Sequence, residues 1–231
     1  MHAPAGASGM WPEVLLAMAL ATPADPAATL DYLALGDSYT IGESVPEAGR
    51  WPVQLAAALR ERGITLADPR IIATTGWTTD ELSAAMDAAE PLGRFDFVSL
   101  LIGVNNQYRG RPVDDYQGEF AGLLDRAIQL AGGRADRVLV LSIPDWGVTP
   151  FGQASGRDTA AIAAELDAYN AAAAAVCAAR GVVFVDITPA SRSPGNQPDR
   201  IADDGLHPSA RAYADWTALA LPFAERLLKD L

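Results

Sequence analysis

The chain has 231 residues, half of them hydrophobic, and carries a formal net charge of −12 at pH 7. That length is typical of one domain with a substantial core. The acidic balance argues against broad electrostatic binding to nucleic acid or to anionic membranes, and no apolar run is long enough to predict stable insertion into a membrane.

The amino-terminal segment, residues 1–29, is rich in Ala and Pro and is expected to be a leader or a loosely ordered segment outside the core. Its apolar run over 14–21 resembles the core of a secretion signal, and Ala19-Leu20-Ala21 resembles a cleavage site. However, no Lys or Arg precedes this run and Glu13 adjoins it. The sequence therefore favours a cytoplasmic location, with a periplasmic or secreted one open if residues 1–29 contain a signal peptide.

Residues 30–231 are predicted to form a single domain of alternating strands and helices. In chain order the first elements are a strand over 30–35, a helix over 51–62, a strand over 70–73, a helix over 78–90, a strand over 95–102 and a helix over 113–131. The rest are a strand over 137–143, a loop over 144–156, a helix over 158–181, a strand over 182–187, a loop over 188–204 and a last helix from Pro208. Five strands that alternate with helices predict a mostly parallel sheet covered on both faces.

Local signals mark where several of these helices begin and end. Thr78 and Glu81 have the spacing of a capping box, which predicts a helix start. Asp158 is suited to cap the helix that Gly181 ends. We expect Pro222 to kink the last helix.

The chain has one cysteine, Cys177, so it can form no intramolecular disulfide. Its neighbours favour a buried helix face, where a thiol packs as a small apolar group. The sequence shows no His and carboxylate residues at metal-ligand spacing, and no glycine-rich phosphate loop follows the first strand. We therefore expect neither a metal nor another cofactor.

Small or polar residues follow four of the five predicted strands. Ser38, Gly76 and Asn105 come after the first, second and third strands, and His207 comes after the fifth strand and its loop. Ligands of open α/β sheets bind beyond the carboxyl ends of the strands. These four residues are therefore expected to meet at one edge of the sheet.

The residue types at this edge suit nucleophilic catalysis. The chain has two histidines, and because His2 lies in the terminal segment, His207 is the available imidazole base. Neutral His207 could take the proton of the Ser38 hydroxyl, which is a poor nucleophile until then. Asp204, three residues before His207, could orient the imidazole; Asp203 is the alternative, and the spacing favours Asp204.

Acyl transfer also needs hydrogen-bond donors that stabilise the negative charge that develops on the carbonyl oxygen. The backbone N–H groups of Ser38 and Gly76 and the side-chain amide of Asn105 could supply three. Asp37, beside Ser38, is expected to hold the turn by hydrogen bonds to the backbone.

Four segments together resemble the sequence blocks of the SGNH, or GDSL, hydrolase superfamily, in that family's order. They are Gly36-Asp37-Ser38, Gly76, Gly103-Val104-Asn105 and Asp204-Gly205-Leu206-His207. The resemblance covers the chain from about residue 30 to its end. It implies a flavodoxin-like three-layer α/β/α sandwich and a metal-free serine esterase mechanism.

By this resemblance, Ser38 is the nucleophile, Gly76 and Asn105 complete the oxyanion hole, and Asp204 and His207 complete the triad. Members often carry Asp after the Asn of the third block, whereas Asn106 stands there in this chain. That position is not one of the core catalytic positions.

The sequence thus predicts a serine hydrolase that cleaves short-chain acyl, aryl or acetylated-sugar esters through an acyl-serine intermediate. Asn106, Trp77 and Trp146 are the candidates for contact with this small-molecule substrate. Thioester or lysophospholipid cleavage, or acyl transfer to an alcohol, would use the same site. The competing class is a non-enzymatic flavodoxin-like binding module, which would leave the combination of Ser, Gly, Asn and Asp–His unexplained. The oligomeric state stays open.

Overall fold

The computed structural model describes residues 1–2, 29–192 and 199–229, so the signal-like run over 14–21 lies outside the described residues. The described strands form one parallel sheet in the order β2-β1-β3-β4-β5. They are β1 (Tyr32–Gly36), β2 (Arg70–Ala73), β3 (Phe97–Leu101), β4 (Val138–Leu141) and β5 (Val183–Val185). The predicted α/β architecture is confirmed.

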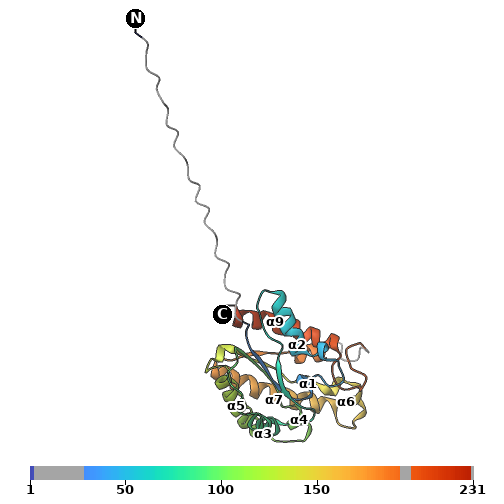
Figure 1. Ribbon diagram of the computed structural model, residues 1–231. Coiled ribbons are helices and arrows are strands. Elements are labelled where there is room, and N and C mark those ends of the chain that lie inside the picture. The colour runs from blue at the N-terminus through green and yellow to red at the C-terminus, as the bar shows by residue number, and fades with distance from the viewer. Residues whose placement is uncertain (3–28, 193–198, 230–231) are drawn as a thin grey trace.

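Helices cover both faces of the sheet, which makes three layers (Figure 1). On one face α2 (Trp51–Glu61) packs against α9 (Ala210–Leu228). On the other face α5 (Val113–Leu130) packs against α3 (Thr79–Ala88) and α7 (Thr159–Arg180). None of the helices within 29–192 and 199–229 combines the length and the apolar character needed to cross a membrane.

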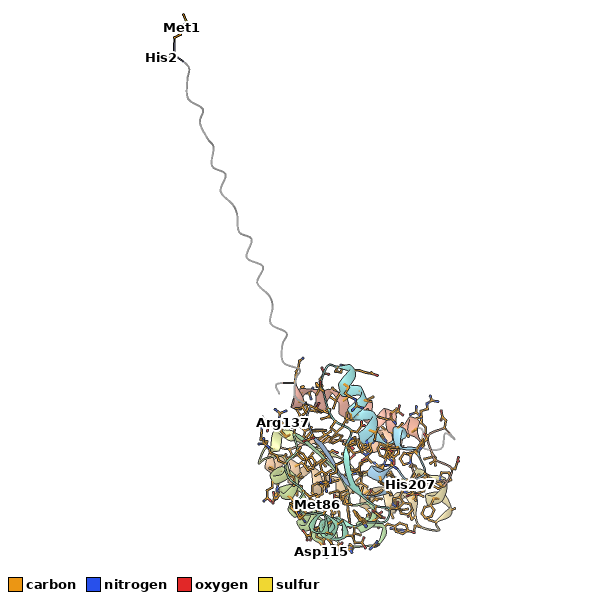
Figure 2. The ribbon with its side chains drawn as sticks, in the orientation of Figure 1. Met1, His2, Met86, Asp115, Arg137 and His207 are labelled. Carbon is orange, nitrogen blue, oxygen red and sulfur yellow. The ribbon has the colours of Figure 1, made fainter. Side chains whose placement is uncertain are left out.

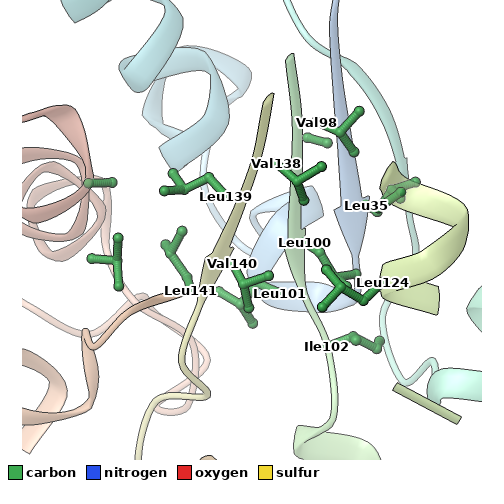
Figure 3. Close-up of a cluster of buried hydrophobic side chains, with 14 of the residues drawn as sticks. Leu35, Val98, Leu100, Leu101, Ile102, Leu124, Val138, Leu139, Val140 and Leu141 are labelled. Carbon is green, nitrogen blue, oxygen red and sulfur yellow. The ribbon is translucent and has the colours of Figure 1, made fainter. Parts of the chain in front are cut away.

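The central strands β1, β3 and β4 are buried at every position. This burial explains why their sequences read as nearly continuous apolar runs, since helices cover both faces. Figure 3 shows the side chains of β3 and β4 packed together with Leu35 of β1 and Leu124 of α5. The one polar side chain of β3, Ser99, is satisfied by a 2.9 Å hydrogen bond with the Tyr32 hydroxyl.

The strand order places a crevice at the carboxyl ends of β1 and β3. From β1 the chain first adds β2 on one side and then crosses back to add β3 on the other. The connections leave the two neighbouring strands in opposite directions, which opens a crevice between them where ligands of such sheets bind. In Figure 2 His207 lies at this end of the molecule, whereas Arg137, which precedes β4, lies at the opposite end.

Several short elements are absent from the prediction. The 3-10 turn η3 (Trp146–Val148) and α6 (Pro150–Ala154) occupy the predicted loop 144–156, and α8 (Thr188–Arg192) begins the predicted loop 188–204. Two further short helices come soon after strands, α1 (Ser38–Ile41) after β1 and α4 (Val104–Tyr108) after β3. The described residues also form the 3-10 turns η1 (Glu47–Gly49) and η2 (Ala135–Arg137). Helices of four or five residues complete barely one turn, so they leave no apolar periodicity to recognise.

The last helix begins later than predicted. Its N-cap is Ser209, whose side chain accepts a hydrogen bond from the Ala212 N–H, and Pro208 instead forms an isolated bridge with Ile201. A serine oxygen satisfies a free N–H of the first turn, which explains why the helix begins after Ser209. The helix continues through Pro222 to its end at Leu228.

Candidate active site

The turn after β1 holds Ser38 at the first position of α1. A side chain at Gly36 would collide with the Leu101 carbonyl oxygen and with Thr40, so this close approach of β1 to its neighbours requires glycine. Asp37 caps α1 through a 3.0 Å hydrogen bond that its Oδ1 accepts from the Tyr39 N–H, as the sequence predicts. The turn therefore presents Ser38 beyond the carboxyl end of β1.

Ser38 opens onto a cleft of about 210 Å³. The cleft is lined by residues from α1, α4, η3, α6 and two loops: Ser38, Tyr39, Thr75, Gly76, Val104, Asn105, Tyr108, Trp146, Phe151, Leu206 and His207. The four residues expected at one sheet edge are among them, so the structure brings Ser38, Gly76, Asn105 and His207 together. Most of the other lining side chains are apolar.

Asp204 and His207 form a close pair at one side of the cleft. Asp204 Oδ2 lies 2.6 Å from His207 Nδ1, and Asp204 Oδ1 accepts hydrogen bonds from the Leu206 and His207 N–H groups, each at 2.9 Å. These bonds hold the loop over 204–207 as a tight turn. Asp203, the alternative partner, is exposed to solvent as Asp204 is, but Asp204 is the acid that contacts His207 Nδ1, and this contact distinguishes the two acids.

The environment keeps Asp204 ionised. Burial alone would raise the pKa of this carboxyl, but hydrogen bonds donated by Leu206, His207 and Ser44 outweigh it and hold the pKa well below its usual range. The Ser44 hydroxyl donates to Oδ2 at 2.7 Å. A charged Asp204 beside Nδ1 favours the tautomer that leaves Nε2 free to accept a proton.

Tyr39 packs against the other side of the imidazole. Its ring meets the His207 ring edge-on, with centroids 5.6 Å apart, and it also lies 6.0 Å from Trp216 of α9. Tyr39 and Leu206 also line a smaller, neighbouring pocket of about 40 Å³. His207 is thus held by packing as well as by Asp204.

Potential hydrogen-bond donors converge on the cleft from the opposite side. Gly76 has φ of +88°, a conformation that favours glycine, and its carbonyl accepts a 2.7 Å hydrogen bond from Arg109. Asn105 Nδ2 donates to the Trp77 carbonyl at 2.9 Å, which fixes the amide and leaves its second hydrogen available. Within the described ranges, neither the Ser38 nor the Gly76 N–H donates to another group.

Asp37 contrasts with Asp204 although both lie close to the cleft. It is fully buried, and this burial raises the pKa of its carboxyl to about 7, although the hydrogen bond from the Tyr39 N–H lowers it in part. Its Oδ2 has no hydrogen-bond partner among the described residues. The two carboxyls therefore differ in protonation below neutral pH, with Asp37 neutral and Asp204 charged.

Of the three candidates for substrate contact, Asn106 and Trp77 do not line the cleft. Asn106 is buried, and its side chain exchanges hydrogen bonds with the Thr79 N–H and hydroxyl, because in α4 it points about 100° away from Asn105. Trp77 packs against the hydrophobic core and does not line the cleft. Trp146 does line the cleft.

Sequence reasoning missed several residues that line the cleft, above all Phe151. Phe151 belongs to α6, one of the short helices that the sequence pattern does not show. The available signal was the cluster of aromatic residues near Pro and Gly in the predicted loop over 144–156, which is unusual for a solvated loop.

Cys177 lies outside the cleft. It is buried in α7, as predicted, and burial raises the pKa of its thiol to about 12. Throughout the described part of the chain, no three His, Cys, Asp or Glu side chains form a group that could hold a metal ion.

Comparison with known proteins gives one family match. A profile of the GDSL-like lipase/acylhydrolase family matches residues 34–214 of this chain. No curated protein matches the chain by sequence.

Solved structures share the fold at low sequence identity. The structure of TesA is 19% identical, with 86% of this chain and 99% of that chain covered and a TM-score of 0.67. Axe2, an acetylxylan esterase from Geobacillus stearothermophilus, is 19% identical, with coverages of 86% and 94% and a TM-score of 0.60. The psychrotrophic esterase EstA from Pseudoalteromonas sp., solved in a form inhibited by monoethylphosphonate, is 15% identical, with coverages of 87% and 94% and a TM-score of 0.59.

Proposed function

Because this chain belongs to the GDSL-like lipase/acylhydrolase family and is a carboxylic ester hydrolase, we propose that Ser38, His207 and Asp204 are its catalytic triad. The observation that carries the proposal is the 2.6 Å contact between Asp204 Oδ2 and His207 Nδ1 beside the cleft that Ser38 also lines. Nucleophile, base and orienting acid are the three parts that serine catalysis requires.

In the first half of the reaction, His207 Nε2 takes the proton of the Ser38 hydroxyl as Oγ attacks the ester carbonyl carbon. The carbonyl π electrons move to its oxygen, which becomes negatively charged. When this tetrahedral intermediate collapses, the bond to the alcohol breaks and His207 gives its proton to the leaving oxygen. The acyl group is then bound to Ser38.

The developing oxyanion is stabilised by the N–H groups of Ser38 and Gly76 and by the free hydrogen of the Asn105 amide. Because the Trp77 carbonyl and the Arg109 side chain already hold this side of the cleft, the donors need no rearrangement when charge develops. Fixed donors of this kind make the largest single contribution in many acyl-transfer enzymes.

In the second half, water replaces the alcohol. His207 takes a proton from a water molecule that attacks the acyl carbon, and the same donors stabilise the second oxyanion. When this second tetrahedral intermediate collapses, the bond between the acyl carbon and Ser38 Oγ breaks, His207 returns the proton to Oγ, and the carboxylic acid is released. Asp204 stays ionised throughout and stabilises the imidazolium that forms twice in each cycle.

The size and lining of the cleft favour small esters. A cavity of about 210 Å³ with mostly apolar walls fits a short acyl, aryl or acetylated-sugar group, rather than a long lipid chain along its whole length. The acidic surface is consistent with neutral substrates.

Covalent labelling tests the proposal. The protein is incubated with a monoethylphosphonate ester that carries a p-nitrophenyl leaving group, and the adduct is located by mass spectrometry of peptides. We expect one phosphonyl group on Ser38, in step with the loss of p-nitrophenyl acetate hydrolysis, and no adduct in His207→Ala over the same time. An unmodified Ser38 in a protein that still hydrolyses the ester would contradict the proposal.

A further inference from the structure

Exposed aromatic side chains gather at the rim of the cleft. Tyr108 is 48% exposed and Phe151 is 38% exposed, whereas other aromatic side chains of the described residues are buried or partly buried. Their ring centroids lie 6.4 Å apart, and Trp146 lies 5.3 Å from the first and 6.0 Å from the second. We call these three residues the aromatic wall.

Three short elements build the aromatic wall, and each is tied down. Trp146, in η3, donates its indole N–H to Gln107 Oε1 at 2.8 Å. Phe151, in α6, donates its backbone N–H to the Gly205 carbonyl at 2.9 Å, which links it to the loop of His207. The rings are therefore held in place although two of them face solvent.

Arg157 supports the aromatic wall from outside the cleft. Its guanidinium lies 5.2 Å from the Trp146 ring centroid and 5.9 Å from that of Tyr108, within the range of cation–π contacts. It also donates to the Tyr108 carbonyl at 3.2 Å and to Glu165 at 3.1 Å. Because Arg157 is already paired and does not line the cleft, it fits a positioning role and not the binding of a substrate anion.

We propose that the aromatic wall selects esters that carry a planar aromatic group, in the alcohol or in the acyl part. The inference rests on the proposed function, since the group would bind in the cleft that contains Ser38. Exposed rings offer π faces and edges to a further ring, and such pairs prefer offset or edge-to-face contacts beyond the effect of buried area. A saturated ring of similar size would bury similar area without those contacts.

Matched pairs of esters separate the aromatic contribution from simple size. For the alcohol side the pair is benzyl acetate and cyclohexylmethyl acetate, and for the acyl side it is ethyl phenylacetate and ethyl cyclohexylacetate. The reacting atoms are the same within each pair, so the ratio of kcat/KM values reports the ring. We expect an aromatic-to-saturated ratio of about 3 to 10 in at least one pair.

Two variants then ask whether the aromatic wall causes the preference. Tyr108→Leu and Phe151→Leu each remove a ring and keep an apolar side chain, and both should move the ratio toward 1. The ratio is taken within each variant, so a general loss of activity or of folded protein cancels. Leu219→Ala is the matched control, because Leu219 is also an exposed large apolar residue but lies on α9 and does not line the cleft; its ratio should equal that of the wild type.

The outcomes separate this inference from the proposed function. Wild-type ratios near 1 in both pairs, or ratios that both leucine variants leave unchanged, would overturn the selective role of the aromatic wall while ester hydrolysis and labelling of Ser38 persist. If Ser38 is not labelled and Ser38→Ala keeps the wild-type activity, the proposed function fails, and the inference fails with it.

Discussion

On one side of the cleft, Ser38, Gly76 and Asn105 follow the ends of strands, and hydrogen bonds with Arg109 and the Trp77 carbonyl hold the last two in place. On the other side, Tyr108 and Phe151 project exposed rings from helices of five residues. The first side, with Asp204 and His207, we call the catalytic edge. Under the proposed function, the catalytic edge offers donors and a nucleophile that any ester can use, whereas the aromatic wall offers contacts that only some esters can make.

If both proposals hold, different parts of this fold determine the rate and the substrate selectivity. Donors fixed by the sheet act on the ester group itself, so their removal should slow all substrates alike. Side chains of the aromatic wall act on the rest of the substrate, so their removal should change the ranking of substrates.

Loss of the nucleophile or of the base should have the largest effect. Ser38→Ala and His207→Ala should each lower kcat by about 10⁵- to 10⁶-fold, the size seen when a triad member of a serine hydrolase is removed. The loss should be equal for aromatic and saturated esters. Steady-state kinetics with both ester pairs measures it, and circular dichroism confirms that the variants are folded. A residual kcat of a few per cent in either variant would contradict the triad.

Asp204→Asn should cost about 10⁴-fold in kcat, because the amide no longer stabilises the imidazolium and can favour the wrong tautomer. Asp203→Asn is the matched control, since Asp203 is adjacent and exposed and the Asp204 carboxylate makes the contact with His207 Nδ1. Its kcat should stay within about 2-fold of the wild-type value. If both variants lost the same activity, the result would assign the effect to negative charge near His207 and not to the hydrogen bond between Asp204 and His207.

Asn105→Ala should lower kcat by about 10²- to 10³-fold with little change in KM, because the lost hydrogen bond forms mainly with the oxyanion. Asn106→Ala is the informative comparison. Asn106 is buried and bonded to Thr79, so its replacement should lower the free energy of unfolding by about 1–3 kcal/mol and leave the oxyanion donors in place. Equal losses of kcat in the two variants would contradict the separate roles of these neighbours.

The sequence was sufficient to predict that Ser38, Gly76 and Asn105 lie at one edge, because parallel strands impose that position. Once β1, β2 and β3 are recognised by their apolar runs, their carboxyl ends must lie together, and Ser38, Gly76 and Asn105 come with them. The spacing of Asp204 and His207 is local, so their contact also follows from the sequence.

The aromatic wall and the buried side chains beside it could not be predicted in the same way. Whether Asn106 faces the cleft or the core depends on α4 being a helix, and five residues carry no periodic pattern. Tyr108 and Phe151 are 43 positions apart in the sequence numbering, and they meet only because α4 and α6 flank the same strand ends. The aromatic residues of the loop over 144–156 are a local signal, but their contact with Tyr108 depends on tertiary packing.

The buried carboxyl of Asp37, next to Ser38, should make the free energy of unfolding depend on pH. Its pKa of about 7 in the folded protein lies above the ordinary 3.8, so between about pH 4 and pH 7 the folded state keeps a proton that the unfolded state has lost. The free energy of unfolding should therefore fall as the pH rises through that window, by a contribution on the order of a few kcal/mol. Asp37→Asn, which cannot ionise, should lack this contribution.

Urea unfolding of wild type and Asp37→Asn at several pH values measures the effect. The difference between the two proteins isolates Asp37, because carboxyls with lowered pKa, such as Asp204, contribute with the opposite sign and to both proteins. Parallel stability curves from pH 4 to pH 7 would contradict a protonated Asp37.

The smallest effect is expected at Arg157, behind the aromatic wall. Arg157→Gln removes the cation from the Trp146 and Tyr108 rings, and we expect KM for the preferred aromatic ester to rise about 2- to 5-fold with kcat nearly constant. Arg180→Gln is the matched control, because Arg180 lies at the other end of α7 and pairs with Asp125 at 2.6 Å. Both variants lose one charge, so a change in the aromatic-to-saturated ratio only in Arg157→Gln would assign the effect to the aromatic wall. A fall in kcat for all esters would instead show that the aromatic wall affects the chemical step at the catalytic edge, and it would contradict separate roles for the two regions.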